Sequence, residues 1–259
     1  MRFLANAGTP LDNRSVPSVA FHNVAKIFPV AAGPAVRALA GVSFELADGE
    51  LLALVGPSGG GKTTTLRLIA GLETPDEGEI SIHGRAVNAV APKDRNVAMV
   101  FQRDALFPHL TAFENLSFGL TLRKTGREEI RERVAVVAKS LGIEACLTRK
   151  PGELSSGQRQ RIALGRALIR RPKVLLLDEP FANLDAPLRR ELRRELVRLH
   201  REQHLTILRV THDQAEALAL GQRVAVMNQG LLEQIGTPAE LRSKPATKFV
   251  AEFLSADVI

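Results

Sequence analysis

Short apolar runs alternate with amphipathic stretches along most of the chain. The apolar runs, bounded by glycine or polar residues, predict strands at 19–28, 42–46, 50–55, 78–82, 97–101, 174–177, 205–210 and 223–227. Apolar residues at helical spacing predict helices at 127–141 and 188–201, and 64–70, 155–169 and 213–220 are further helix candidates. Strands that alternate with helices favour a mostly parallel sheet flanked by helices, so the pattern indicates an α/β fold.

The middle of the chain departs from this alternation. Residues 103–157 have mostly helical character, with Ile130, Val134, Val137 and Leu141 at helical spacing. We therefore expect a helical lobe inserted into the α/β core. Ser155 is a suitable N-cap for the helix that follows this lobe. The polar residues 1–17 predict a disordered tail.

A glycine-rich segment joins the third predicted strand to the first predicted helix. It reads GPSGGGKTT and comprises Gly56, Pro57, Ser58, Gly59, Gly60, Gly61, Lys62, Thr63 and Thr64. In this context glycines let backbone N–H groups turn toward phosphates, and the helix directs its positive end at the same anions. Lys62 can reach the outer phosphates, and the Thr63 hydroxyl can hold Mg²⁺. The alternative is a chance lysine in a flexible loop. The segment predicts a site for a nucleoside triphosphate.

Two acids follow the apolar strand at 174–177. Asp178 and Glu179 end a strand that is otherwise fully apolar, and burying such acids is unfavourable unless they serve a function. The carboxyl ends of parallel strands border the crevice where ligands bind. There Asp178 can hold Mg²⁺ through water, and Glu179 can polarise the attacking water or accept its proton. The alternative is an acidic turn.

Two further strand ends carry polar side chains. His212 follows the strand at 205–210 and could contact the γ-phosphate and orient the attacking water. Gln102 follows the strand at 97–101, and its amide could sense Mg²⁺ or water without bringing a charge. Taken alone, each is more simply a polar residue in a turn, and only the neighbouring phosphate loop favours the catalytic interpretation.

The segment LSSGQRQ at 154–160 predicts a second anion site. It combines the hydroxyl of Ser155, the backbone of Gly157 and the start of a helix. This site lies at the helical lobe, so one chain cannot easily place it on the nucleotide held by the phosphate loop. A two-fold dimer can, because it brings the second site of one copy to the first site of the other.

Composition narrows the class of protein. The chain has 259 residues, 45% of them hydrophobic, a single cysteine (Cys146) and a net charge of +7. It has no apolar run near the ~18 residues that span a bilayer and no internal disulfide is possible, which favours the cytoplasm. The positive charge suggests either a polyanionic partner or a solvated face. Much of it lies on the outer face of the helix at 188–201, without interleaved aromatic residues, which favours the solvated face.

These motifs together resemble the ATPases of ATP-binding cassette (ABC) transporters, over about residues 19–254. In family terms they are Walker A at 56–64, the Q-loop at Gln102, the signature at 154–158, Walker B at 174–179, the D-loop around Asp185 and the switch histidine His212. The resemblance implies that Phe28 stacks on adenine, although Phe28 is also compatible with a core position. It implies that Gln102 contacts Mg²⁺ and that the partner copy's ATP is bound by Ser155, Ser156, Gly157 and Gln158. Ser156 replaces the usual signature glycine, and we expect weakened or unchanged function.

The resemblance also implies a fold. It is a P-loop NTPase core (RecA-like, about 18–102 and 158–259) of mostly parallel sheet flanked by helices, with an antiparallel β subdomain and a helical subdomain at about 103–157. Residues 101–120, 212–220 and 233–241 are similar to importer ATPases of the maltose, polyamine, ferric-iron and sulfate group. In that group a groove after the Q-loop, near Phe107 and His109, receives a helix of the membrane subunit. Many members carry a C-terminal regulatory β-domain, which this sequence, ending at Ile259, is expected to lack.

The resemblance finally implies partners. We expect a homodimer that binds ATP and Mg²⁺, integral membrane permease subunits, a separate solute-binding protein, no nucleic acid, and a peripheral location on the cytoplasmic face of the inner or plasma membrane. The alternative is a soluble ATPase of the same type that acts on nucleic acid or ribosomes. The chain lacks the long coiled coil and the second cassette typical of those proteins. A binding module without hydrolysis is disfavoured because Glu179 and His212 are both present.

Overall fold

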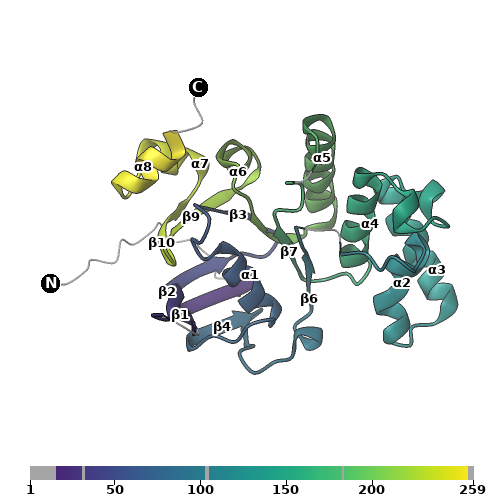
Figure 1. Ribbon diagram of the computed structural model, residues 1–259, viewed down its shortest axis with the longest axis horizontal. Helices are drawn as coiled ribbons and strands as arrows, with labels where there is room; N and C mark the ends of the chain where they lie inside the picture. The colour runs from purple at the N-terminus through teal and green to yellow at the C-terminus, as the bar shows by residue number, and fades with distance from the viewer. Residues whose placement is uncertain (1–15, 31–32, 103–104, 183, 256–259) are drawn as a thin grey trace.

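The computed structural model describes residues 16–30, 33–102, 105–182 and 184–255. Its centre is a six-stranded sheet in the order β10-β9-β3-β8-β7-β6 (Figure 1). The strands are β3 (Leu51–Val55), β6 (Val97–Val100), β7 (Val174–Asp178), β8 (Thr206–Val210), β9 (Arg223–Asn228) and β10 (Leu231–Gly236). All are parallel except β10, which pairs antiparallel to β9 at the edge. The carboxyl ends of the parallel strands therefore meet along one edge of the sheet.

A separate antiparallel sheet has the order β2-β1-β4-β5. Its strands are β1 (Val19–Phe28), β2 (Val36–Leu46), β4 (Glu77–Ile82) and β5 (Arg85–Ala86). Helix α1 (Lys62–Ala70) lies between the two sheets, because Leu66 and Ile69 share one apolar cluster with Phe21 of β1 and Leu176 of β7. Burial on both sides fixes the start of α1, and with it the phosphate loop.

The opposite face of the central sheet is covered by helices. Helix α5 (Ala186–Gln203) buries Leu192, Leu196 and Leu199 against it, as the amphipathic pattern predicts. Helices α6 (Gln214–Leu220), α7 (Pro238–Ser243) and α8 (Lys248–Ser255) form a smaller cluster with β3 and β9. Within the described residues, no helix combines the length and apolar character needed to cross a bilayer.

A group of helices forms one end of the molecule (Figure 1). It contains α2 (Ala112–Leu122), α3 (Arg127–Leu141) and α4 (Ser156–Leu168), with short 3₁₀ turns η2 (Glu144–Cys146) and η3 (Pro151–Glu153). A further turn, η1 (Pro92–Asp94), precedes β6. The predicted helical lobe is confirmed as a run of helices, and Cys146 is buried within it. The predicted boundary at 157/158 falls inside α4, which packs against both α2 and α3.

The α/β fold with its antiparallel sheet is confirmed, and several predicted elements match closely. The strand at 19–28 and the helix at 127–141 have their predicted bounds. Other bounds differ from the prediction: β2 begins at Val36 rather than 42, because it pairs with the whole of β1, and β6 ends at Val100, leaving Phe101 exposed. The pattern did not predict α2, β5, β10, α7 or α8 individually. Most of the predicted disordered tail, residues 1–15, lies outside the described residues.

Candidate functional site

The glycine-rich loop has a backbone that only glycine tolerates at two points. Gly56 follows β3, and a Cβ there would overlap the carbonyl oxygen of Met227 in β9. Gly61 precedes α1 with a φ of 98°, and a Cβ there would lie 2.6 Å from the carbonyl oxygen of Ala38 in β2. The loop is therefore pressed against both sheets, with its N–H groups at the start of α1.

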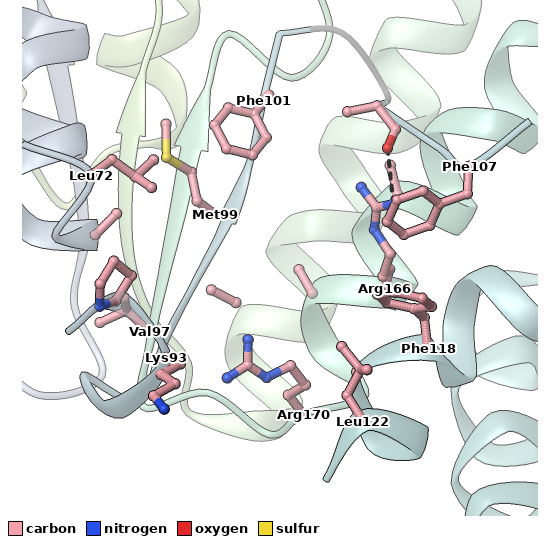
Figure 2. Close-up of a pocket in the computed structure, with 17 residues that line it drawn as sticks. Leu72, Lys93, Val97, Met99, Phe101, Phe107, Phe118, Leu122, Arg166 and Arg170 are labelled. Carbon is pink, nitrogen blue, oxygen red and sulfur yellow. Dashed lines mark hydrogen bonds between the residues drawn. The ribbon is translucent and has the colours of Figure 1, made fainter.

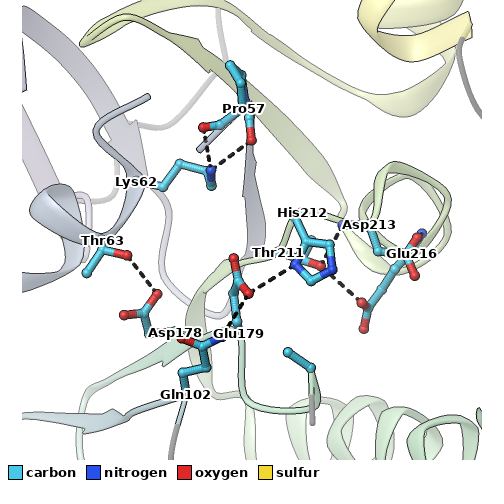
Figure 3. Close-up of polar contacts among 12 residues, drawn as sticks. Pro57, Lys62, Thr63, Gln102, Asp178, Glu179, Thr211, His212, Asp213 and Glu216 are labelled. Atoms are coloured by element: carbon cyan, nitrogen blue, oxygen red, sulfur yellow. Dashed lines mark hydrogen bonds and ion pairs between the residues drawn. The ribbon is translucent and has the colours of Figure 1, made fainter. Parts of the chain in front are cut away.

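Lys62 is buried at the first turn of α1. Its ammonium donates to the carbonyl oxygens of Gly56 at 2.7 Å and Pro57 at 2.8 Å (Figure 3). Burial lowers the pKa of Lys62, while the charges of Glu179 and Asp178 oppose that shift. An ammonium has three donors, so the side chain can hold the loop in shape and still offer a charged donor to a phosphate.

Thr63 and Asp178 form an oxygen-rich pair beside the loop. The Thr63 hydroxyl donates to Oδ1 of Asp178 at 3.1 Å. Burial raises the pKa of Asp178, and the bond from Thr63 opposes that shift. A hydroxyl and a carboxylate are the ligands that Mg²⁺ takes when substrate phosphates and water complete its shell. The described residues contain no cluster of three His, Cys, Asp or Glu side chains that could hold a metal ion.

Glu179 lies between two other predicted site residues, His212 and Gln102. Its Oε2 is 3.0 Å from Nδ1 of His212 and 3.5 Å from Nε2 of Gln102 (Figure 3). Because a carboxylate only accepts, Nδ1 of His212 carries the proton in this contact. The backbone of Glu179 has a φ of 46°, and its N–H donates to the carbonyl oxygen of Val210. A non-glycine residue held in this region is strained, and such strain concentrates at functional sites.

The predicted second anion site is a helix N-terminus. Ser155 caps α4: its hydroxyl accepts from the N–H of Gln158, whose side chain accepts from the N–H of Ser155. Ser155 and Ser156 are exposed, and a Cβ at Gly157 would lie 2.7 Å from Leu188 of α5. Within the described chain, no hydrogen bond links residues 155–158 to the loop at 56–63. Figure 1 shows α4 among the helices at one end of the molecule and α1 near the two sheets.

Phe28 is the last residue of β1 and pairs with Val36 of β2. Val36 lies two residues before Ala38, which contacts the phosphate loop at Gly61. Its ring is half-buried and outside the three core clusters of the described residues. The Lys26 ammonium lies 5.2 Å from the ring centroid. Adenine stacking on Phe28 stays a prediction.

The sequence reasoning missed a buried polar network behind His212. The hydroxyl of Thr211 donates to Glu216 at 3.1 Å and accepts from the N–H of Asp213 at 3.1 Å. Glu216 also pairs with Arg209 of β8. A signal was present, because an arginine inside the apolar strand TILRV is costly to bury without a partner.

Comparison with known proteins identifies the family. The sequence model of the family described as ABC transporter matches residues 39–182, more than half of the chain. The chain belongs to the ABC transporter family. The match spans the phosphate loop, Gln102, the Ser155 turn and the Asp178–Glu179 pair, which the structure describes above.

The relatives agree with this assignment. The osmoprotective compounds uptake ATP-binding protein GgtA of Synechocystis is 51% identical over 92% of this chain and 64% of its own length. The sn-glycerol-3-phosphate import ATP-binding protein UgpC of Chromobacterium violaceum is 53% identical over 90% of this chain and 62% of its own. The chain thus spans less than two thirds of these curated relatives.

A solved structure has the same fold. It is the dimeric structure of a post-hydrolysis state of the ATP-binding cassette MJ0796 bound to ADP and Pi. It is 33% identical, with a TM-score of 0.77, over 85% of this chain and 98% of that one.

Proposed function

We propose that this chain is the ATP-binding and ATP-hydrolysing subunit of an import ABC transporter. The observation that carries the proposal is the convergence of the Lys62 loop, the Thr63–Asp178 pair and the Glu179–His212 pair on one edge of the central sheet. The names of the relatives support import, since GgtA is named for uptake and UgpC for import. Those names give different cargoes, so the cargo of this chain stays open.

The site's residues divide the work of hydrolysis. The loop N–H groups and the Lys62 ammonium bind the phosphates, and the ammonium stabilises charge that develops on them. Thr63 and Asp178, with Gln102 beside them, would hold Mg²⁺, which neutralises phosphate charge when it is bound. Glu179 accepts the proton of the attacking water. His212, whose Nδ1 donates to Glu179, keeps that carboxylate oriented toward the water.

A second copy completes the site. The turn of Ser155, Ser156, Gly157 and Gln158, in which the two serines are exposed, offers a helix N-terminus and a hydroxyl. A two-fold dimer places this turn against the ATP of its partner. The dimeric state of the solved relative supports this arrangement. The closed dimer then prefers ATP over ADP, and that difference in affinity moves the helical subdomains.

The membrane partner has a candidate docking groove. A groove of about 490 Å³ lies between β6, α2 and α4, and it is lined by Leu72, Phe101, Phe107, Phe118, Leu122, Arg166 and Arg170 among others (Figure 2). Leu122 is 70% exposed, which is unusual for a large apolar side chain unless a partner covers it. His109 lies against Phe107 at the same end. Phe101 directly precedes Gln102, so a helix docked here would lie close to the Glu179 site.

This groove supports the assignment of permease subunits as partners. A chain that docks on them lies peripherally on the cytoplasmic face of the membrane, and a separate solute-binding protein selects the cargo. The alternative, a soluble ATPase on nucleic acid, rests on the charge of +7 alone. Part of that charge is paired on α5, where Arg198 contacts Glu195 and Glu202. Co-purification with integral membrane proteins would support transport, and co-purification with nucleic acid would support the alternative.

The Glu179→Gln variant tests hydrolysis and dimerisation together. It should bind ATP, form a dimer that persists in ATP, and lose about 10²–10⁴-fold in turnover, because the amide cannot accept the proton. Light scattering with and without ATP measures the dimer, and phosphate release measures turnover. Glu202→Gln, at an exposed ion pair near the end of α5, is the matched control and should behave as wild type. Near-normal hydrolysis by Glu179→Gln would remove Glu179 from this role.

A further inference from the structure

Arg209 is a buried cation in the middle of the central sheet. It lies on β8, paired with Ala53 of β3 and Leu177 of β7, and only 2% of its surface is exposed. Burial lowers its pKa to about 9, with the nearby charge of Arg193 adding to the shift and Asp213 opposing it. The group thus stays charged near neutral pH, inside a layer whose other strand residues are almost all apolar.

The contacts of Arg209 lead to both sides of His212. Its guanidinium pairs with Glu216, and the other carboxylate oxygen of Glu216 accepts from the hydroxyl of Thr211. Arg193 of α5 also pairs with Glu216 at 2.5 Å and donates to Asp213 at 2.9 Å. Thr211 and Asp213 are the residues immediately before and after His212, so this network holds the backbone on both sides of the histidine.

A second contact leads to Glu179. The guanidinium of Arg209 lies over the ring of Phe181, 5.0 Å from its centroid, and Phe181 is buried two residues after Glu179. Arg209 therefore touches the segments that carry both partners of the 3.0 Å His212–Glu179 contact, without touching either side chain in that contact.

Stability alone gives a poor account of this arginine. Its Nε and Nη1 have no hydrogen-bond partner among the described residues. Buried polar groups without partners cost free energy, and replacing a whole buried ion pair by apolar side chains of similar size is often neutral or stabilising. The buried arginine is explained if its contacts with Glu216 and Phe181 fix the positions of the segments that carry His212 and Glu179, which an apolar side chain could not do.

We propose that Arg209 is a positioning residue that holds His212 in register with Glu179, through Glu216 on one side and Phe181 on the other. It acts on the catalytic pair through these neighbours. The proposal deepens the proposed function and rests on it for its effect on turnover. Its effect on the histidine itself is independent of hydrolysis.

Arg209→Met and the double variant Arg209→Met/Glu216→Met test the proposal. Ring ¹⁵N spectra of the six histidines measure the tautomer of His212, with His212→Ala assigning its signal. In wild type Nδ1 carries the proton, because it donates to the Glu179 carboxylate. We expect the Nδ1–H population to fall in both variants, and turnover to fall by about 10–100-fold, the loss typical of displaced catalytic groups. ATP affinity should stay within about twofold, since the phosphate loop is untouched.

The double variant separates positioning from stability. Arg209→Met leaves the buried carboxylate of Glu216 with Arg193 as its remaining ion-pair partner, whereas the double variant removes that carboxylate, so the double variant should unfold at a higher temperature. If Arg209 only stabilises the fold, the double variant regains both the tautomer and the turnover, and that result would overturn the proposal. Arg223→Met is the matched control: it breaks the Arg223–Glu50 pair at the opposite end of the strands and should leave the His212 tautomer unchanged. A wild-type protein without ATPase activity would sink the proposed function, while the tautomer would still test Arg209.

Discussion

The contact between the phosphate loop and the antiparallel sheet predicts how much unfolding free energy is lost when a methyl group is added at Gly61. Gly61 has a φ of 98°, and a Cβ there would lie 2.6 Å from the carbonyl oxygen of Ala38 and 2.7 Å from Cδ2 of Leu39. The left-handed backbone costs an L-residue about 1–2 kcal/mol. Overpacking against a backbone oxygen adds about 1–3 kcal/mol. Gly61→Ala should therefore lose about 2–5 kcal/mol of unfolding free energy.

Gly59 provides the matched control in the same loop. Its φ is 79°, but a Cβ there would meet nothing within 4 Å. Gly59→Ala should therefore lose only the backbone contribution of about 1–2 kcal/mol. For a chain of this size 1 kcal/mol shifts the melting temperature by about 2–4 °C, so Gly61→Ala should melt about 2–12 °C below Gly59→Ala.

Thermal unfolding of the nucleotide-free variants, followed by circular dichroism, measures this difference. Urea unfolding gives the free energies directly, provided that the slopes with denaturant are the same. Equal losses in the two alanine variants would refute the reasoning. They would mean that the loop is not pressed against β2, and that only backbone conformation selects glycine at position 61.

Two further predictions concern ionisable groups. Asp178→Asn should raise the melting temperature of the nucleotide-free protein, because burial raises the pKa of Asp178 and its ionised form therefore destabilises the fold at neutral pH. Calorimetry measures this change, and a lower melting temperature would contradict the prediction. The pKa values of Glu114 and Glu240 are lowered, first by backbone N–H bonds from Thr111 and Thr237 and next by the hydroxyls of the same residues. Their stabilisation is thus present above the ordinary pKa of 4.5 and is lost as pH falls through the lower folded values. Glu114→Gln/Glu240→Gln should flatten the fall of the urea midpoint between about pH 5 and pH 3, and an unchanged slope would show that these caps do not contribute.

Local signals in the sequence were sufficient for much of the fold. The apolar runs of β3 and β7 and the spacing in α3 are independent of distant contacts, so their positions could be predicted. The edge strand β10 could not, because its residues LLEQIG are partly exposed and show no alternation. Its conformation depends on pairing with β9, which lies outside any local window.

The candidate site could also be predicted from the sequence only in part. Lys62, Asp178, Glu179 and His212 follow strand ends, and parallel topology is enough to bring strand ends together. The strained φ of Glu179 and the network of Arg209 could not be predicted, since both depend on tertiary contacts between β7, β8 and α6. The arginine within an apolar strand was the one visible sign of that network.

The enclosure of α1 between the two sheets has a consequence for measurement. Although α1 has only nine residues, Thr65, Leu66, Leu68, Ile69 and Ala70 are all buried. Its amides cannot exchange with deuterium by fraying, so their slow exchange reports the opening of the whole domain. A ligand bound at the N-terminus of α1 stabilises the folded state by mass action, so it slows the exchange of these amides. The exchange rate of the α1 amides therefore reports the affinity for nucleotide in the intact protein.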